Sequence, residues 1–209
     1  MITIYFGSPG VGKSSLLARF ALIHHIRSKL PKFLRKYDRV LSNYPIKHTY
    51  LFDKSDIGQF DLTMGGYKDK TESNTLVLFD EAGVDFSARA YKLLKDYQNE
   101  HFRKHRKYRE DWIVCSQVFN DMDKTIRDLA PRLYYLKKCT YLPYHIKALR
   151  LKKSCSVDDT SHQIIDGYEF DHWFIRIFTT RRFYLPFYWG LFESWDAPDL
   201  PYKEFKRYD

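Results

Sequence analysis

Gly7-Ser8-Pro9-Gly10-Val11-Gly12-Lys13-Ser14 is the stretch that decides the fold of this chain of 209 residues. Its spacing, G-x-x-x-x-G-K-S, is typical of the phosphate-binding loop of nucleoside triphosphatases. Ile2 to Phe6, directly before it, form a β-branched and aromatic run that predicts a buried strand. Residues from Ser14 to about Leu30 predict a helix with one apolar face. The order of strand, glycine loop and helix predicts a P-loop fold.

Each part of this loop has a chemical role in holding a triphosphate. Glycines let successive backbone N–H groups wrap the phosphates, and the helix amino terminus adds donors and a positive dipole end. Lys13 is expected to reach the β- and γ-phosphates, and the Ser14 hydroxyl to ligate Mg²⁺. No guanine-reading N-K-x-D motif is evident in the sequence, so ATP is the expected nucleotide. The predicted binding residues are Gly7, Ser8, Pro9, Gly10, Val11, Gly12, Lys13, Ser14 and Ser15.

A second informative stretch is the apolar run from Thr75 to Phe79, which ends in Asp80 and Glu81. An unbroken apolar run predicts a parallel strand covered on both faces. Asp80 fits the role of the direct or outer-sphere Mg²⁺ partner. Glu81 fits the general base that polarises water for attack on the γ-phosphate. The alternative is that the acidic pair only caps the end of the strand.

Two further polar positions lie downstream of this acidic pair. Residues 111–117 predict a strand, and Gln117 at its tip can contact the γ-phosphate or position the attacking water, or else is a plain loop amide. Residues 121–129 predict a short helix, and Arg127 and Arg132 flank its end. One of these arginines is expected to act in trans as an arginine finger, with a salt bridge at the helix end as the alternative. The predicted catalytic residues are Lys13, Glu81, Gln117 and Arg127.

The fold class predicted from these elements is α/β, a P-loop NTPase with a mainly parallel central sheet flanked by helices and a C-terminal antiparallel β extension. We expect the ATPase core at residues 1–140, the β extension of the same domain at 141–195, and a mobile tail at 196–209. The extension is expected to contain strands at residues 145–152, 172–178 and 187–192. The other expected elements are strands at 39–43 and 133–136, a polar insertion at 46–74, and a long charged helix at 89–107 with a basic end.

Composition limits the class of protein and its surroundings. A hydrophobic content of 44% predicts a folded chain, and a net charge of +9 suits a nucleic acid, an anionic membrane face or an acidic partner. The three cysteines form no pairing pattern, so we expect reduced thiols, and no zinc-ligand spacing is present. The sequence shows no signal peptide, and its best candidate for a membrane span, residues 183–192, is about half the required length. The C-terminal aromatics are core packing, or an exposed patch for a partner or a membrane interface.

In this order the motifs resemble those of Zot-type ATPases, the N-terminal domain of filamentous-phage assembly proteins related to zonula occludens toxin. The resemblance covers nearly the whole chain. It rests on the phosphate loop, on Leu78-Phe79-Asp80-Glu81-Ala82-Gly83, and on a basic helix end followed by a strand closing in Ser116-Gln117. It also rests on residues 123–129 and on the closing residues 188–194.

The resemblance implies a Mg²⁺-dependent, ATP-hydrolysing motor that forms a ring-shaped homo-oligomer in the host cytoplasm at the inner membrane. Its implied work is the assembly and extrusion of filamentous virions, with phage coat or membrane assembly proteins as partners, and with peripheral membrane contact through such a partner. The alternatives are a DNA-translocating or helicase-loading ATPase that uses the basic surface on nucleic acid, a small-molecule P-loop kinase, and a nucleotide-dependent adaptor with negligible turnover.

Overall fold

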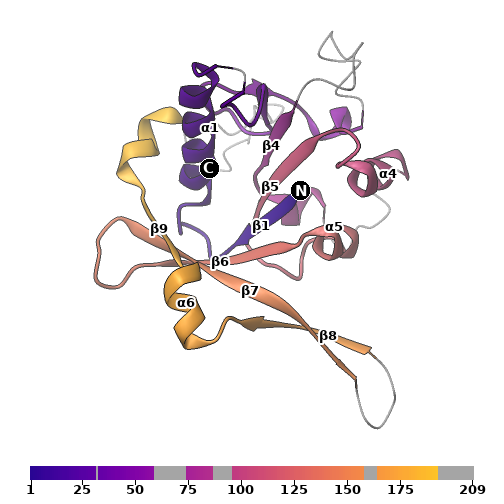
Figure 1. The fold of residues 1–209 in the computed structure, drawn as a ribbon, viewed down its shortest axis with the longest axis vertical. Coiled ribbons are helices and arrows are strands. Elements are labelled where there is room, and N and C mark those ends of the chain that lie inside the picture. Colours follow the sequence, from indigo (N-terminus) through magenta and orange to yellow (C-terminus); the bar gives the residue numbers. More distant parts are fainter. Residues whose placement is uncertain (32, 59–73, 87–95, 158–163, 193–209) are drawn as a thin grey trace, which may run out of the picture.

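The computed structural model describes residues 1–31, 33–58, 74–86, 96–157 and 164–192. Within these ranges a nine-stranded sheet has the order β3-β2-β4-β5-β1-β6-β7-β8, and β9 pairs with β7 (Figure 1). All neighbouring pairs from β3 to β6 are parallel. These strands are β1 (Ile2–Phe6), β2 (Arg39–Ser42), β3 (Tyr50–Leu51), β4 (Thr75–Phe79), β5 (Glu110–Ser116) and β6 (Arg132–Lys138).

The position of β5 determines where the predicted motifs meet. It lies between β4, which leads into the acidic pair, and β1, which leads into the phosphate loop. Ile4 is in register with Val114, and Leu78 with Ile113, so the three strands end together. Because parallel strands present their carboxyl ends at one edge, the loop, Asp80 and Gln117 converge there. The predicted mainly parallel central sheet is confirmed, and β5 lies between the strands that carry the two motifs.

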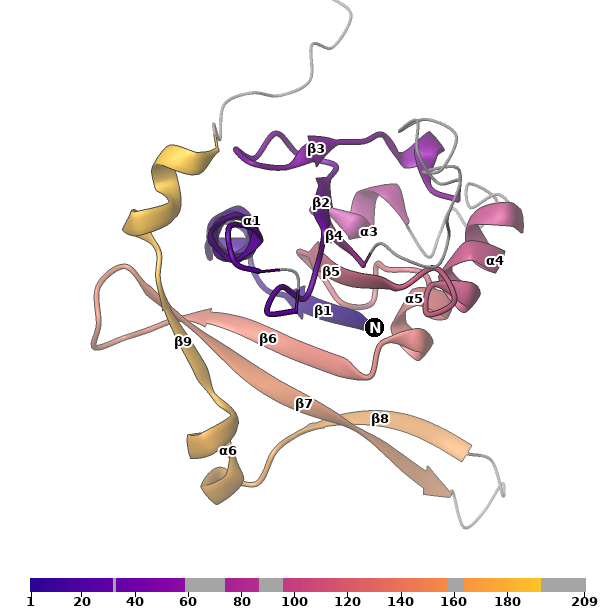
Figure 2. The same cartoon turned by 45° about the horizontal axis from the view of Figure 1, so that its top comes forward.

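Helices cover both faces of this sheet (Figure 2). The helix α1 (Lys13–Ser28) packs on one face, and α3 (Ala82–Asp85), α4 (Asp96–Lys104) and α5 (Lys124–Leu129) lie on the other. Strand residues alternate between the two layers: Ile4 packs in the core with α4 and α5, while Tyr5 packs in the core with α1. Burial on both faces explains why the apolar runs in the sequence show no polar alternation.

The C-terminal extension is antiparallel, as predicted, but two of its predicted strands are wrong. The observed strands are β7 (His145–Val157), β8 (Ile164–Phe170) and β9 (Arg181–Tyr184). The predicted strand at 172–178 is instead a helix, α6 (Trp173–Thr179), and that at 187–192 is mostly a 3-10 helix, η3 (Pro186–Leu191). Aromatic and β-branched residues favour strands only where a sheet packs against their side chains, and the large apolar residues of α6 are exposed instead. Pro186 at the first turn of η3 suits a helix start.

Other element boundaries differ little from expectation. The predicted helix at 89–107 is seen as α4, and its residues 89–95 lie outside the described ranges. The predicted insertion contains β3 and a short 3-10 helix, η1 (Lys54–Asp56), while residues 59–73 and the predicted tail lie outside those ranges. The division into segments at residues 140 and 195 stays a prediction. None of the helices in the described part of the chain has the length and apolarity needed to cross a bilayer.

Candidate nucleotide-binding site

A cavity of about 640 Å³ lies at the carboxyl ends of β1, β4 and β5. It is lined by the phosphate loop, by the predicted acidic pair, by the tip of β5, and by an aromatic segment from the C-terminal extension. The lining residues are Pro9, Gly10, Gly12, Lys13, Ser14, Ser15, Asp80, Glu81, Gln117, Leu185, Trp189 and Phe192. The fold therefore brings together Lys13, Glu81 and Gln117, three of the four predicted catalytic residues.

Glycine is required in the loop for two different reasons. Gly10 and Gly12 have φ angles of 68° and 101°, in the region that side chains with a Cβ disfavour. Gly7 instead lies against β6, where an added Cβ would sit 2.6 Å from the Leu136 carbonyl oxygen. The left-handed Gly12 is also the N-cap of α1, so the turn it makes aims the first N–H groups of the helix at the cavity.

Lys13 is folded back onto its own loop. Its Nζ donates to the Gly7 carbonyl at 2.9 Å and to the Ser8 carbonyl at 3.1 Å, and only 8% of the residue is exposed. Burial lowers the pKa of Lys13, while the nearby Asp80 carboxylate opposes that shift. The ammonium group is thus held at the loop, where it can exchange carbonyl oxygens for phosphate oxygens.

Asp80 and Ser14 meet across the cavity. The Ser14 hydroxyl donates to Asp80 Oδ2 at 2.7 Å, and the Glu81 backbone N–H donates to Oδ1 at 2.9 Å. Burial raises the pKa of Asp80, and the Ser14 hydrogen bond pulls it back down. A buried carboxylate beside a hydroxyl is a set of hard oxygen donors, and a divalent cation would compensate its burial. These two residues fit Mg²⁺.

Asn43 is a site residue that sequence reasoning missed. Its Nδ2 donates to the Asp80 carbonyl at 3.0 Å, and its Oδ1 accepts from the Asp80 N–H at 2.7 Å. This pair of bonds clamps the backbone of Asp80 to the end of β2, the next strand in the sheet. A polar residue at the end of a predicted strand was the available signal, but the strand order that places it beside Asp80 is not visible in the sequence.

Glu81 has an unusual backbone and an exposed side chain. Its φ and ψ of 55° and 36° place a non-glycine residue in the left-handed region, at the N-cap of α3. Such a conformation costs about 1 kcal/mol or more and tends to occur at functional sites. Gln117 is also exposed, directly after β5. These two exposed polar side chains line the same cavity, and each follows one of two neighbouring strands.

Neither predicted arginine lies in the cavity lining. Arg127 donates from Nη1 to Asn120 Oδ1 at 3.3 Å and stacks over the Phe119 ring at 5.3 Å. Arg132 begins β6 and therefore lies at the opposite, amino-end edge of the sheet. If Arg127 contacts a triphosphate, that triphosphate must be bound to a neighbouring copy of the chain.

The apolar part of the cavity was also missed. Leu185, Trp189 and Phe192 line it, although two of them lie in a segment that we expected to be strand. The only sequence signal was the cluster of aromatic residues at 187–192, which does not reveal that the chain returns to α1.

Comparison with known proteins agrees with this geometry. The family model described as Zonular occludens toxin (Zot) matches residues 1–170. The crystal structure of the N-terminal domain of zonular occludens toxin from Neisseria meningitidis is similar, with a TM-score of 0.54 and 18% identity over 81% of this chain and 94% of that one. The genome packaging NTPase B204 from Sulfolobus turreted icosahedral virus 2, in complex with AMPPCP, has a TM-score of 0.50 and 14% identity over 79% and 95%. No curated protein matches the sequence.

The match over residues 1–170 shows the family, and the structural likenesses show the P-loop NTPase fold. The phosphate loop, the buried Asp80 and the cavity beside them lie together at the carboxyl edge of the sheet. The chain belongs to the Zot family and is a nucleotide-binding P-loop ATPase.

Proposed function

We propose that the protein is a Mg²⁺-dependent, ATP-hydrolysing motor that drives the assembly and extrusion of filamentous phage virions at the host inner membrane. The observation that carries the ATPase part is the hydrogen bond between Ser14 and Asp80, next to a strained, exposed Glu81 in one cavity. Membership of the Zot family supports the assembly part. The site residues are Gly7 to Ser15 for the nucleotide, Ser14 and Asp80 for the metal, and Lys13, Glu81, Gln117 and Arg127 for catalysis.

Hydrolysis in this site needs a base, a cation and a positioned water. The Glu81 carboxylate accepts a proton from water as the water oxygen bonds to the γ-phosphorus, and the bond to the bridging oxygen breaks to release ADP. Gln117 orients that water through its amide, and Lys13 moves from the carbonyls of Gly7 and Ser8 to the phosphate oxygens. Mg²⁺, when bound, neutralises charge on the phosphates. Asn43 keeps the Asp80 backbone fixed during these events.

A ring-forming homo-oligomer is part of the proposal. Since Arg127 lies outside the cavity of its own chain, its proposed role as an arginine finger requires a neighbouring protomer. Oligomer formation would also let one protomer's hydrolysis affect the next.

The helix α6 supports contact with the phage coat or membrane assembly proteins. It projects beside β9, away from the parallel part of the sheet (Figure 1). Five of its seven residues are large, apolar and exposed: Trp173, Phe174, Ile175, Ile177 and Phe178. Exposed apolar surface of this kind usually marks an interaction site. A membrane assembly protein with an apolar surface would cover these residues and attach the ATPase peripherally to the membrane.

Phage release tests the proposal. In cells producing the phage, replacement of the protein by Glu81→Gln should stop the release of virions while phage DNA and coat protein accumulate inside. Purified Glu81→Gln protein should bind ATP without hydrolysing it. Normal extracellular titre with the hydrolysis-deficient protein would contradict the motor function, and normal hydrolysis would contradict the role of Glu81.

A DNA-translocating ATPase is the second candidate, favoured by the net charge of +9 and by the fold shared with a genome packaging NTPase. It predicts ATP hydrolysis stimulated by DNA, with binding that weakens steeply as salt increases. This candidate would be excluded if DNA did not stimulate ATP hydrolysis and if the Glu81→Gln protein blocked virion release at the stage of coat assembly.

A further inference from the structure

The cavity has a polar end and an apolar end, and the two come from different parts of the chain. Across the sheet, Asp80 follows β4 and Gln117 follows β5, on one side of the loop that follows β1. Leu185 follows β9, which pairs with β7 on the other side. A triphosphate lying on the loop with its γ-phosphate at the polar end therefore extends its nucleoside toward Leu185 and the segment after it.

The segment η3 is held against the nucleotide loop and α1. Leu185 packs so closely that a Cβ on Gly12 would sit 2.6 Å from its Cδ1. The Leu185 N–H donates to the Tyr144 carbonyl at 3.0 Å, which fixes the entry of η3. At its other end, the Lys47 N–H donates to the Leu191 carbonyl at 2.9 Å, and Lys47 Nζ donates to the Gly190 carbonyl at 3.0 Å.

Trp189 lies in the middle of this segment with half its surface exposed. Its exposed fraction is 49%, and it lines the cavity. The Tyr144 ring meets it edge to face, with centroids 5.7 Å apart and an interplanar angle of 83°. A T-shaped neighbour orients an indole without covering both of its faces. Trp189 is thus a fixed aromatic platform beside a phosphate-binding loop.

We propose that η3 forms the nucleobase subsite of this ATPase and that Trp189 stacks on the base. This inference rests on the proposed function, because it assigns the apolar end of the same site. The apolar lining residues at this end are Leu185, Trp189 and Phe192, which have no side-chain amide or carboxylate to read a base edge. Stacking alone is tolerant of base identity. The subsite should accept adenine and guanine nucleotides with similar affinity.

The test compares a nucleotide with a ligand that has phosphates and no base. Calorimetry on the full chain measures Kd for ATP, GTP and inorganic tripolyphosphate, each with Mg²⁺. Trp189→Ala should weaken ATP and GTP roughly tenfold and leave tripolyphosphate unchanged, while Trp189→Phe retains most of the affinity. The matched control is Trp173→Ala, which removes an exposed indole on α6, outside the lining of this cavity.

Each outcome separates the two proposals. Unchanged ATP affinity in Trp189→Ala, or an equal loss for tripolyphosphate, overturns the base subsite. Lys13→Ala should weaken all three ligands; if it binds them normally, the assignment of the phosphate site fails instead. Should Trp189→Ala not fold, tryptophan fluorescence keeps the test open: ATP should quench wild-type emission, tripolyphosphate should not, and Trp189→Phe should lose the quench. Quenching that persists in Trp189→Phe would overturn the proposal.

Discussion

Two acidic pairs lie at the ends of two neighbouring parallel strands, and the groups that surround them differ. Asp80 and Glu81 follow the carboxyl end of β4, whereas Glu110 and Asp111 begin β5. Since β4 and β5 are parallel and in register, the pairs lie at opposite edges of the sheet. Each pair consists of one aspartate and one glutamate, so residue type does not distinguish the two pairs.

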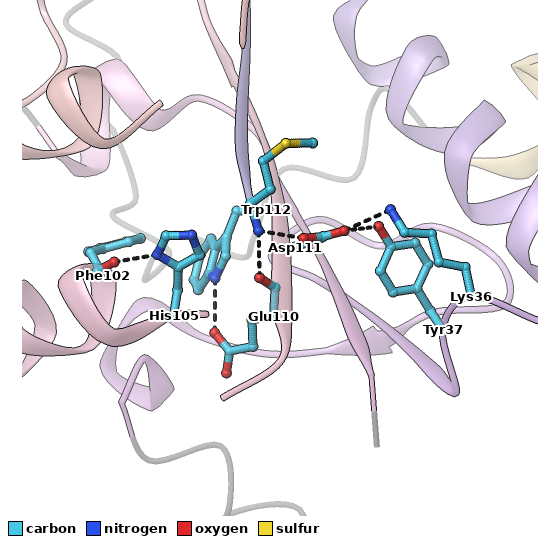
Figure 3. Close-up of polar contacts among 8 residues, drawn as sticks. Lys36, Tyr37, Phe102, His105, Glu110, Asp111 and Trp112 are labelled. Carbon is cyan, nitrogen blue, oxygen red and sulfur yellow. Dashed lines mark hydrogen bonds and ion pairs between the residues drawn. The ribbon is translucent and has the colours of Figure 1, made fainter. Parts of the chain in front are cut away.

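The pair at the amino edge is surrounded by donors from its own chain (Figure 3). Glu110 Oε2 accepts from Trp112 Nε1 at 2.9 Å and lies 2.8 Å from His101 Nε2. Asp111 accepts from the Met1 ammonium group and from Tyr37, and from Lys36 Nζ at 2.9 Å. Asp111 thus ties Met1, directly before β1, and the segment before β2 to β5, while Glu110 lies against His101 of α4. We infer a structural role for both carboxylates.

The pair at the carboxyl edge is arranged for a ligand. Asp80 is buried with a raised pKa, and Glu81 is exposed in a cavity with a strained backbone. The comparison teaches that, in a parallel sheet, the end of the strand on which an acid lies says more about its role than the acid itself. Substitutions at the two edges should therefore separate activity from stability.

Lys13→Ala should have the largest effect. Loss of the ammonium group removes the cation at the phosphates, so kcat/KM for ATP should fall by on the order of 10³. The matched control is Lys36→Ala at the amino edge, which should hydrolyse ATP within about twofold of wild type because the group that it removes lies at a surface ion pair. Phosphate release measures both. If Lys13→Ala hydrolysed ATP near the wild-type rate, the carboxyl edge of the sheet could not be assigned to activity, and the two edges would not differ in role.

Glu81→Gln should have the next largest effect, on turnover and not on binding. The amide cannot accept the proton of the attacking water, so kcat should fall by about 10² or more while Kd for ATP changes little. Asp111→Asn, its counterpart at the other edge, should keep kcat near wild type at neutral pH. Single-turnover hydrolysis and equilibrium binding check this pair, and a large drop in kcat for Asp111→Asn would contradict the division of roles.

Glu110→Ala should reverse the pattern, with a loss of stability and no direct effect on chemistry. It leaves the buried Trp112 N–H without this acceptor, so the free energy of unfolding should fall by about 2–3 kcal/mol. Glu100→Ala is the control: this exposed residue pairs with Lys104 at i,i+4 on α4, and its loss should leave the free energy of unfolding nearly unchanged because water screens the pair. Urea denaturation at neutral pH measures both, and equal midpoints would contradict a structural role for Glu110.

Much of the parallel core and its loop could be predicted from the sequence because local patterns determine them. The glycine spacing requires a particular backbone, and the apolar run before Asp80 requires burial on both faces. The roles of Asn43 and Trp189 could not be predicted, since each depends on which strands and segments are neighbours in space. The strand predictions at α6 and η3 failed because aromatic and β-branched composition favours a strand only when a sheet neighbour is present.

The smallest effect is a pH dependence at the amino edge. Burial alone would raise the pKa of Asp111, but hydrogen bonds from the Met1 ammonium group, Tyr37 and Lys36 lower it to about 2 from a usual 3.8. A carboxyl group whose pKa is lower in the folded than in the unfolded state stabilises the fold above the unfolded pKa, and that contribution disappears as pH falls from about 4 toward 2.

Because Asp111 is partly exposed, we expect about 1–2 kcal/mol from this group, less than the full linkage value. Asp111→Asn should thus be less stable than wild type by this amount at pH 6, and the difference should shrink between pH 4 and pH 2. Denaturant unfolding at a series of pH values measures it. A difference that stays constant down to pH 2 would mean that Asp111 acts through shape and hydrogen bonding, not through its charge, and the contrast between the edges would then be one of packing.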